Sequence, residues 1–225
     1  MASNILVLGA GELGTVILTA LAARAPPSTK ISVLLRPTTI SSPSPNKAKE
    51  LSYLTSLNIS LVPGDIATSS LSTLAALFKP YDLVISALGF ASGPGSQVKI
   101  TNAVLAAKVK RFVPWQFGVD YDVVGRGSAQ PVWDEQLDVR ELLRSQSGKG
   151  TEWIIVSTGI FMSFLFEDFF GVVSVSEGDV TVRALGSWEN QVTVTTPRDI
   201  GRLTSEIVFW EPEFRDEVVF VAGET

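Results

Sequence analysis

Three glycines near the start of the chain have the spacing of a turn that binds the diphosphate of a nucleotide. They follow the apolar residues 4–8 and open a helical pattern, within the sequence Gly9-Ala10-Gly11-Glu12-Leu13-Gly14. In such a motif the first glycine permits a tight turn, the second lets the backbone approach the diphosphate, and the third lets helix and strand pack closely. The start of the helix adds unpaired N–H groups and the positive end of its dipole. The motif predicts a dinucleotide site whose contacts are Gly9, Gly11, Glu12, Leu13 and Gly14.

The end of the second expected strand indicates which dinucleotide binds. Sites for NAD place an acidic residue about 20 residues beyond the glycine motif, where it binds the ribose hydroxyls. This chain has Leu34-Leu35-Arg36 there, without an acidic neighbour. Arg36 can pair with a 2′-phosphate, which a carboxylate would repel. Lys47 could add a second positive charge, although a solvated lysine explains it equally well. We therefore expect NADP(H) as the cofactor.

The composition removes several kinds of chemistry. The 225 residues include no cysteine and no histidine, so thiol catalysis, a histidine base and zinc hydrolysis are excluded. The net charge of −5 argues against direct binding of nucleic acid. No apolar run is long enough to span a membrane, and the first residues do not resemble a signal peptide. We expect a cytoplasmic protein that acts on a small molecule, with no bound metal.

Short apolar runs alternate with helical patterns along most of the chain. The expected strands are Asn4–Leu8, Ile31–Leu35, Ile59–Val62, Asp82–Ala87, Arg111–Pro114 and Glu152–Ser157. The expected helices lie near residues 12–24, 46–57, 70–78, 96–108 and 132–146. This alternation predicts an α/β fold, a Rossmann-like, doubly wound parallel sheet with helices on both faces. The small residues Ser86 and Ala87, at the end of a central strand, leave room for the cofactor above it, although close packing explains them equally well.

The pattern changes after Ser157. An aromatic-rich stretch over 161–170 precedes an expected hairpin around 172–195, a helix near 197–209 and a last strand, Glu217–Val221. We divide the chain into a nucleotide-binding domain, 1–157, and a smaller part, 158–225, which is interleaved with the end of the sheet. Pro37–Pro45 is rich in Ser, Thr and Pro and indicates a mobile loop.

Several of these segments together resemble the NmrA-like, isoflavone-reductase-like group, an atypical branch of the short-chain dehydrogenases. The resemblance rests on the glycine motif, Arg36, Val62–Asp65, Gln97, the helix Ile100–Ala107, Lys110–Gly118 and Thr195–Gly201. It implies a Rossmann-like NADP-binding domain, a small C-terminal substrate domain, and reduction of aromatic metabolites by hydride transfer from NADPH. It also implies that Gln97, Phe117 and Gly118 lie near the nicotinamide and that Phe161 lies near the substrate, although aromatic side chains in 161–170 are more often core.

The chain departs from the family's pattern where catalysis would occur. Trp115-Gln116 stands where the reductases usually have Ser-Glu, so Trp115 would narrow or reshape the substrate pocket. Gln136 stands at the position of their catalytic lysine; an amide can donate a hydrogen bond but cannot transfer a proton at neutral pH. There is also no Tyr-x-x-x-Lys pair. Tyr121 is the most suitable remaining proton donor, although a surface-loop tyrosine is the more common explanation. Family members usually continue further, so this chain is either a fragment or has an unusually open site.

Three functions fit these residues. The first is an NADPH-dependent reductase of an aromatic or other secondary-metabolite molecule, with Gln136 or water in place of the lysine. The second is a non-catalytic NAD(P)-binding sensor of the NmrA type, which would act through a protein partner. The third is an inactive interaction partner that keeps only the fold. We rank them in this order, because the glycine motif is intact while the catalytic lysine is missing.

Overall fold

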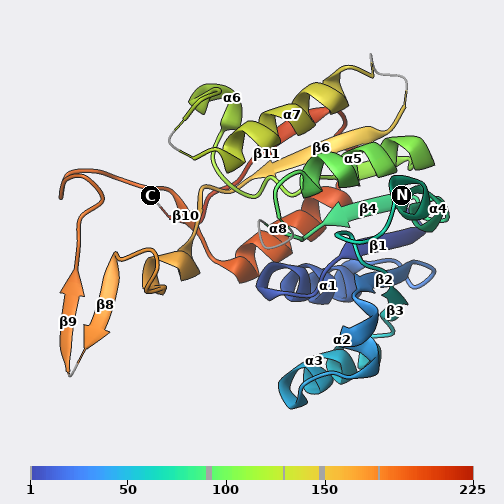
Figure 1. Cartoon of the computed structure of the whole chain (residues 1–225), viewed down its shortest axis with the longest axis horizontal. Helices are drawn as coiled ribbons and strands as arrows, with labels where there is room; N and C mark the ends of the chain where they lie inside the picture. The colour runs from blue at the N-terminus through green and yellow to red at the C-terminus, as the bar shows by residue number, and fades with distance from the viewer. Residues whose placement is uncertain (1, 90–92, 129, 147–149, 177, 225) are drawn as a thin grey trace.

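A parallel sheet of seven strands forms the centre of the protein (Figure 1). The computed structural model describes residues 2–89, 93–128, 130–146, 150–176 and 178–224. The strand order is β11-β6-β5-β4-β1-β2-β3, and every neighbouring pair is parallel. The strands are β1 (Asn4–Leu8), β2 (Lys30–Leu35), β3 (Ser60–Pro63), β4 (Leu83–Ser86), β5 (Arg111–Val113), β6 (Glu152–Ser157) and β11 (Glu217–Phe220). Central strands such as β1 and β4 are buried, as their continuous apolar sequence predicts.

Helices cover both faces of this sheet, which confirms the predicted doubly wound architecture (Figure 1). One face carries α1 (Glu12–Arg24), α3 (Pro45–Ser56) and α8 (Pro197–Val208). The other carries α4 (Leu71–Phe78), α5 (Ser96–Ala107) and α7 (Val132–Arg144). Helices α1 and α8 lie so close together that a Cβ atom on Gly201 would be 2.7 Å from the backbone of Val16.

The strand order reverses between β1 and β4. From β1 the chain builds outward through β2 and β3, and from β4 it builds the other way through β5, β6 and β11. In doubly wound folds, ligands bind in the crevice beyond the carboxyl ends of the strands at such a switch point. The topology therefore places the glycine motif, which follows β1, at the expected binding edge.

The segment after β6 leaves the sheet and then returns to it. It forms β7 (Ile160–Phe161), a 3-10 turn over Met162–Phe166, and a hairpin of β8 (Val173–Ser176) and β9 (Asp179–Val182) that stands away from the sheet (Figure 1). The expected hairpin around 172–195 is correct only in its first half. β10 (Val194–Thr195) pairs in parallel with β7 instead, and α8 and β11 then rejoin the main body. The division between 1–157 and 158–225 stays a prediction.

The expectation of a mobile loop over Pro37–Pro45 is wrong. Residues Pro37–Ser41 form the short helix α2, and α3 begins directly at Pro45. Proline at the first helical position supplies the right backbone angle and loses no hydrogen bond there, and Ser44 caps α3 by accepting from the N–H of Lys47. Pro37, Ser44 and Pro45, which suggested a loop, are therefore helix-start residues.

No helix within the described ranges is long and apolar enough to cross a membrane. Nor do the described residues include a group of three or more acidic side chains placed to hold a metal ion.

Candidate functional site

A cavity of about 440 Å³ lies beyond the carboxyl ends of β1 to β4. It contains five residues that the sequence predicted as cofactor contacts: Gly9, Gly11, Arg36, Lys47 and Ala87. The other lining residues are Ala10, Leu34, Leu35, Thr39, Gly64, Asp65, Ile66, Ala67, Leu88 and Gly89. Sequence reasoning assigned no role to Thr39 or to 64–67. Residues 64–67 directly follow β3, so the rule that ligands bind at strand ends could have found them.

The glycine turn has the geometry that a diphosphate site requires. Gly9 has a φ of +90°, which favours glycine, and its N–H donates to the carbonyl of Leu34 at 3.1 Å. A Cβ atom on Gly14 would lie 2.2 Å from the carbonyl oxygen of Gly9, so only glycine lets α1 start this close to the turn. A Cβ atom on Gly11 would meet nothing within 4 Å, so its backbone borders open space. The turn therefore fits a bound diphosphate.

Three predicted contacts within the motif do not line the cavity: Gly14, which packs against Gly9, and the residues Glu12 and Leu13. Leu13 is buried in the core, and Glu12 is exposed at the first position of α1. A cofactor role for them stays a prediction and would run through the N–H groups at the start of α1, not through their side chains.

Arg36 and Lys47 supply positive charge at the β2 side of the cavity. Arg36 is exposed and makes no ion pair with any residue that the structure describes. Lys47 is partly engaged: its Nζ donates to the carbonyl of Ala10 at 3.0 Å and pairs with the carboxylate of Glu50. Arg36 is therefore ready to bind an anion, whereas Lys47 must share its charge with Glu50.

The end of β4 forms the opposite side of the cavity. Ala87, Leu88 and Gly89 line it, whereas Ser86 is fully buried and its hydroxyl has no hydrogen-bond partner among the described residues. Trp115 lies over Gly89: the nearest indole atom is 3.2 Å from where a Cβ atom on Gly89 would be. Ser86 thus lies behind the wall of the cavity, and Ala87 in it.

Of the three residues expected at the nicotinamide end, Gln97 and Phe117 are buried and hold the fold together. The Gln97 amide nitrogen donates to the carbonyl of Leu88 at 2.7 Å, which ties α5 to the end of β4. Phe117 is packed in the core. Gly118 is half-buried, and its carbonyl accepts hydrogen bonds from Ser157 and from two backbone N–H groups after β6. A direct contact of these residues with the cofactor stays a prediction.

Gly118 also borders a second, more open cavity of about 510 Å³. This cavity lies beyond the ends of β6 and β11, and most of its lining is apolar, with Val119, Ile160, Val192 and Phe220 among the residues. The same edge of the sheet therefore carries two cavities, a cationic one over β1–β4 and an apolar one over β6 and β11.

Glu135, near the start of α7, links this helix to α5. Its carboxylate accepts hydrogen bonds from the N–H groups of Gly95, Gln97 and Val98, at 3.0, 2.7 and 3.2 Å. A carboxylate at a helix N-terminus satisfies free N–H groups and interacts favourably with the helix dipole. Glu135 thereby fixes the position of its neighbour Gln136 relative to the end of β4.

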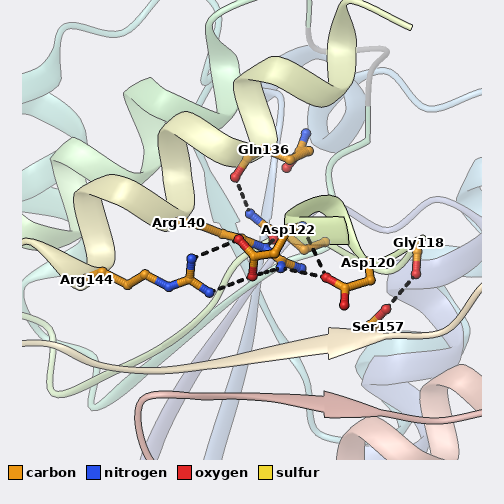
Figure 2. A network of polar contacts seen from close by, with 8 residues as sticks. Gly118, Asp120, Asp122, Gln136, Arg140, Arg144 and Ser157 are labelled. Carbon is orange, nitrogen blue, oxygen red and sulfur yellow. Dashed lines mark hydrogen bonds and ion pairs between the residues drawn. The ribbon is translucent and has the colours of Figure 1, made fainter. Parts of the chain in front are cut away.

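Gln136 is fully buried, and both polar atoms of its side chain lack a partner within the described part of the chain. Figure 2 shows this side chain turned away from Arg140. Its backbone carbonyl, by contrast, accepts from the Gln116 amide nitrogen at 2.8 Å, and the Gln116 amide oxygen accepts from Arg140 at 2.7 Å. An amide left unsatisfied in the interior is unusual and has hydrogen bonds to offer to a water molecule or ligand.

Arg140 continues this network into the loop after β5 (Figure 2). Its buried guanidinium pairs with Asp120 and Asp122, and Asp122 also pairs with Arg144 at 2.6 Å. Hydrogen bonds from Arg144, then from Arg140, lower the pKa of Asp122 to about 2 although burial opposes this. The network holds α7, and with it Gln136, against that loop.

The sequence favoured a surface-loop position for Tyr121, and this prediction is wrong. Tyr121 is 2% exposed, at the start of the short helix α6 (Tyr121–Val124). Its ring packs edge-on against Trp133 and lies under the Arg140 guanidinium, 5.4 Å from it. Burial raises the pKa of the hydroxyl to about 12, although Arg140 opposes the shift, so the group stays protonated at neutral pH. A Cβ atom on Gly118 would lie 2.6 Å from this hydroxyl.

Phe161 lies apart from the cofactor cavity. It is 7% exposed and stacks on Phe164 with ring centroids 5.3 Å apart, within the core on the α1 and α8 face. The structure therefore favours the core explanation for this part of the aromatic stretch, and a substrate contact stays a prediction.

The sequence model of the NmrA-like family matches residues 1–225. The chain belongs to the NmrA-like family. This confirms the resemblance that the motifs predict.

Among the relatives of this NmrA-like chain is an NmrA-like family domain-containing oxidoreductase of Gibberella moniliformis, 53% identical over 228 residues. The match covers 100% of this chain and 73% of that protein. A phenylcoumaran benzylic ether reductase, Betv6 of Betula pendula, is 30% identical over 222 residues, which cover 93% of this chain and 69% of the reductase.

Solved structures share the fold. A crystal structure of isoflavone reductase superposes with a TM-score of 0.76 at 23% identity, covering 98% of this chain and 69% of the reductase. A binary complex of leucoanthocyanidin reductase with NADPH from Vitis vinifera superposes with a TM-score of 0.74 at 20% identity, covering 96% and 68%. These matches confirm the Rossmann-like fold.

Proposed function

We propose that this NmrA-like chain binds NADP(H) in the cavity over β1–β4. The observation that carries the proposal is the glycine turn opening onto a cavity that also contains Arg36, which has no ion-pair partner among the described residues. The turn would hold the diphosphate, and Arg36, helped by Lys47, would hold the 2′-phosphate. The solved leucoanthocyanidin reductase complex with the same fold contains NADPH, which is consistent with this assignment.

The reaction that we assign to the site is reduction of an aromatic or other secondary-metabolite molecule. When bound, NADPH supplies the hydride for such a reaction. The relatives support the class, because one is named an oxidoreductase and another reduces phenylcoumaran benzylic ethers. The chain itself would orient both partners at the carboxyl edge of the sheet.

Proton delivery is the step for which this chain lacks the family's usual group. Gln136 can donate a hydrogen bond but no proton, and its full burial means that a water molecule or a local opening must connect it to a substrate oxygen. The buried hydroxyl of Tyr121 is protonated and lies beside Gly118, so it could supply the proton through water. We expect a slow reductase, because loss of a positioned acid costs about 10²–10⁴-fold in rate.

A second function, an NAD(P)-binding sensor that acts through a protein partner, is favoured by one observation. Gln136, which the resemblance places at the position of the family's catalytic lysine, is an amide whose side chain is fully buried. A site that binds a dinucleotide without an accessible acid or base would report the cofactor's concentration and leave it unchanged.

Titration and turnover separate these functions. We expect micromolar binding of NADPH by calorimetry, and NADPH oxidation in the presence of phenolic ketones or enones. Tight binding without turnover would support the sensor, and failure to bind either dinucleotide would contradict both functions. Gln136→Lys should raise turnover if the lost lysine limits the rate, and Gln136→Ala should abolish it if the amide takes part directly. Circular dichroism of both variants checks that they fold.

A further inference from the structure

The hairpin of β8 and β9 presents a free strand edge. β9 pairs with β8 on one side and with no other strand in the described part of the chain. It is the outer strand of the hairpin, and all four of its residues are exposed (Figure 1). A two-stranded hairpin is only marginally stable in water, and a free edge offers its N–H and C=O groups to a further strand. β9 is therefore a candidate for strand addition.

The pairing with β8 determines which backbone groups of β9 face outward. The N–H of Arg183, directly after β9, donates to the carbonyl of Val172 at 2.8 Å. In an antiparallel pair every second residue bonds to the neighbouring strand, so Thr181 also turns its backbone groups toward β8. The N–H and C=O groups of Val180 and Val182 therefore point to the free edge.

The two faces of the hairpin differ in character. Residues that lie opposite each other in the ladder share a face, and one face carries only valines from both strands. On this face Val180 and Val182 are 64% and 51% exposed. Side chains alternate along a strand, so Asp179, Thr181 and Arg183 lie on the other face. Two opposite charges thus flank Thr181 at equal distances along the edge.

Neither charge is matched within the chain. Arg183 donates from one nitrogen to the carbonyl of Gly171 and to the hydroxyl of Ser174, both at 3.3 Å, and makes no ion pair with a described residue. The bond to Ser174 holds the guanidinium on the polar face of the hairpin. Asp179 likewise has no cationic partner among the residues that the structure describes. Both charges are therefore available to a partner at this edge.

We propose that β9 pairs with β9 of a second copy of this chain, antiparallel and centred on Thr181. In this register Asp179 lies opposite Arg183 of the second copy, twice in each dimer, because both lie two residues from the centre. Val180 lies opposite Val182, and these are the residues whose backbone groups are free to form the new ladder. A register centred on Asp179 or on Arg183 would instead place like charges opposite each other, which is unfavourable. The dimer therefore contains a four-stranded sheet with one continuous valine face.

Cysteine cross-linking tests this register without any ligand, because the chain contains no cysteine. Thr181→Cys places a thiol opposite its counterpart, where the Cα atoms of a non-hydrogen-bonded pair lie about 4.5 Å apart, within the range of a disulfide. Asp179→Cys on the same edge is the matched control, because its counterpart would be about 13 Å away. We expect mild oxidation to join Thr181→Cys into dimers at least about tenfold faster than Asp179→Cys. A mixture of Asp179→Cys and Arg183→Cys should form mixed dimers faster than either variant alone.

Sedimentation tests the role of the charges. We expect the wild type to form a reversible dimer, and Arg183→Asp to weaken it by about tenfold, because attraction becomes repulsion at both ends of the strand pair. Asp179→Arg combined with Arg183→Asp should restore the dimer. This double variant also lacks the hydrogen bonds of Arg183 to Gly171 and Ser174, so restored association would show that the charge pair is responsible.

Two results would overturn the inference. The first is a wild type that sediments as a monomer up to its limit of solubility. The second is a dimer in which Thr181→Cys cross-links no faster than Asp179→Cys, because the copies would then meet through another surface. Either result leaves the proposed NADP(H) binding untouched, since β9 does not line the cavity over β1–β4.

Discussion

The two glycines Gly11 and Gly14 should respond to alanine in opposite ways. A Cβ atom on Gly14 would lie 2.2 Å from the carbonyl oxygen of Gly9 and 2.9 Å from its carbon, so backbone must move. Overpacking of this kind costs about 1–3 kcal/mol, and the better helix propensity of alanine returns at most about 1 kcal/mol. At Gly11 the φ of −86° suits alanine and the space is open, so we expect stability to change by less than about 0.5 kcal/mol.

Thermal unfolding and calorimetry test the pair together. For Gly14→Ala we expect a net loss of about 2 kcal/mol, which lowers Tm by about 4–8 °C in a domain of this size. For Gly11→Ala we expect an unchanged Tm and at least about tenfold weaker binding of NADPH, because the new methyl group lies where the diphosphate must approach the backbone. A Gly14→Ala variant with the Tm of the wild type would refute the packing argument. A Gly11→Ala variant that binds NADPH normally would refute the placement of the diphosphate.

Three other changes test the charges. Arg36→Ala should weaken NADPH binding in calorimetry by about tenfold, which is the lower end of the loss expected for an exposed charge-assisted hydrogen bond. It should leave NADH binding unchanged. Equal losses for both dinucleotides would contradict the 2′-phosphate assignment. Glu50→Gln should strengthen NADPH binding by about two- to fivefold at low salt, because it frees Lys47; weaker binding would show that Glu50 supports the site. Asp122→Asn should lower the free energy of unfolding at neutral pH by about 1 kcal/mol, a figure reduced for the exposure of the carboxylate. Because the pKa of Asp122 is lowered from 3.8 to about 2, the difference in unfolding free energy between wild type and variant is complete above pH 3.8 and disappears as the pH falls through 2. A difference that does not depend on pH would argue against the ion pairs with Arg140 and Arg144.

The sheet could be predicted from the sequence because local pattern and tertiary environment agree there. The buried strands are continuously apolar, and the glycine motif fixes the turn after β1. Where long-range contacts decide, prediction failed. Tyr121 lies in a segment with no periodic pattern, and its ring packs against Arg140 and Trp133, from a helix later in the chain. Residues 183–193 contain no strand, because β10 pairs with β7 and not with the hairpin.

The same distinction applies to the site. Residues that act through the backbone, such as Gly9 and Gly14, were predictable, because their role follows from chain geometry. The state of Lys47 was not, because it depends on Ala10 and Glu50, which only the fold brings to it. The burial of Gln136 likewise depends on how α7 packs, which no motif in the sequence records.

A crystal structure of the chain with NADP⁺ tests the central claim most directly. Our account predicts the diphosphate on the glycine turn, the 2′-phosphate within hydrogen-bond distance of Arg36, and the nicotinamide on the β4 side of the cavity, beside Gly89. Density for the dinucleotide in the apolar cavity over β6 and β11, or its absence at a saturating concentration, would contradict it.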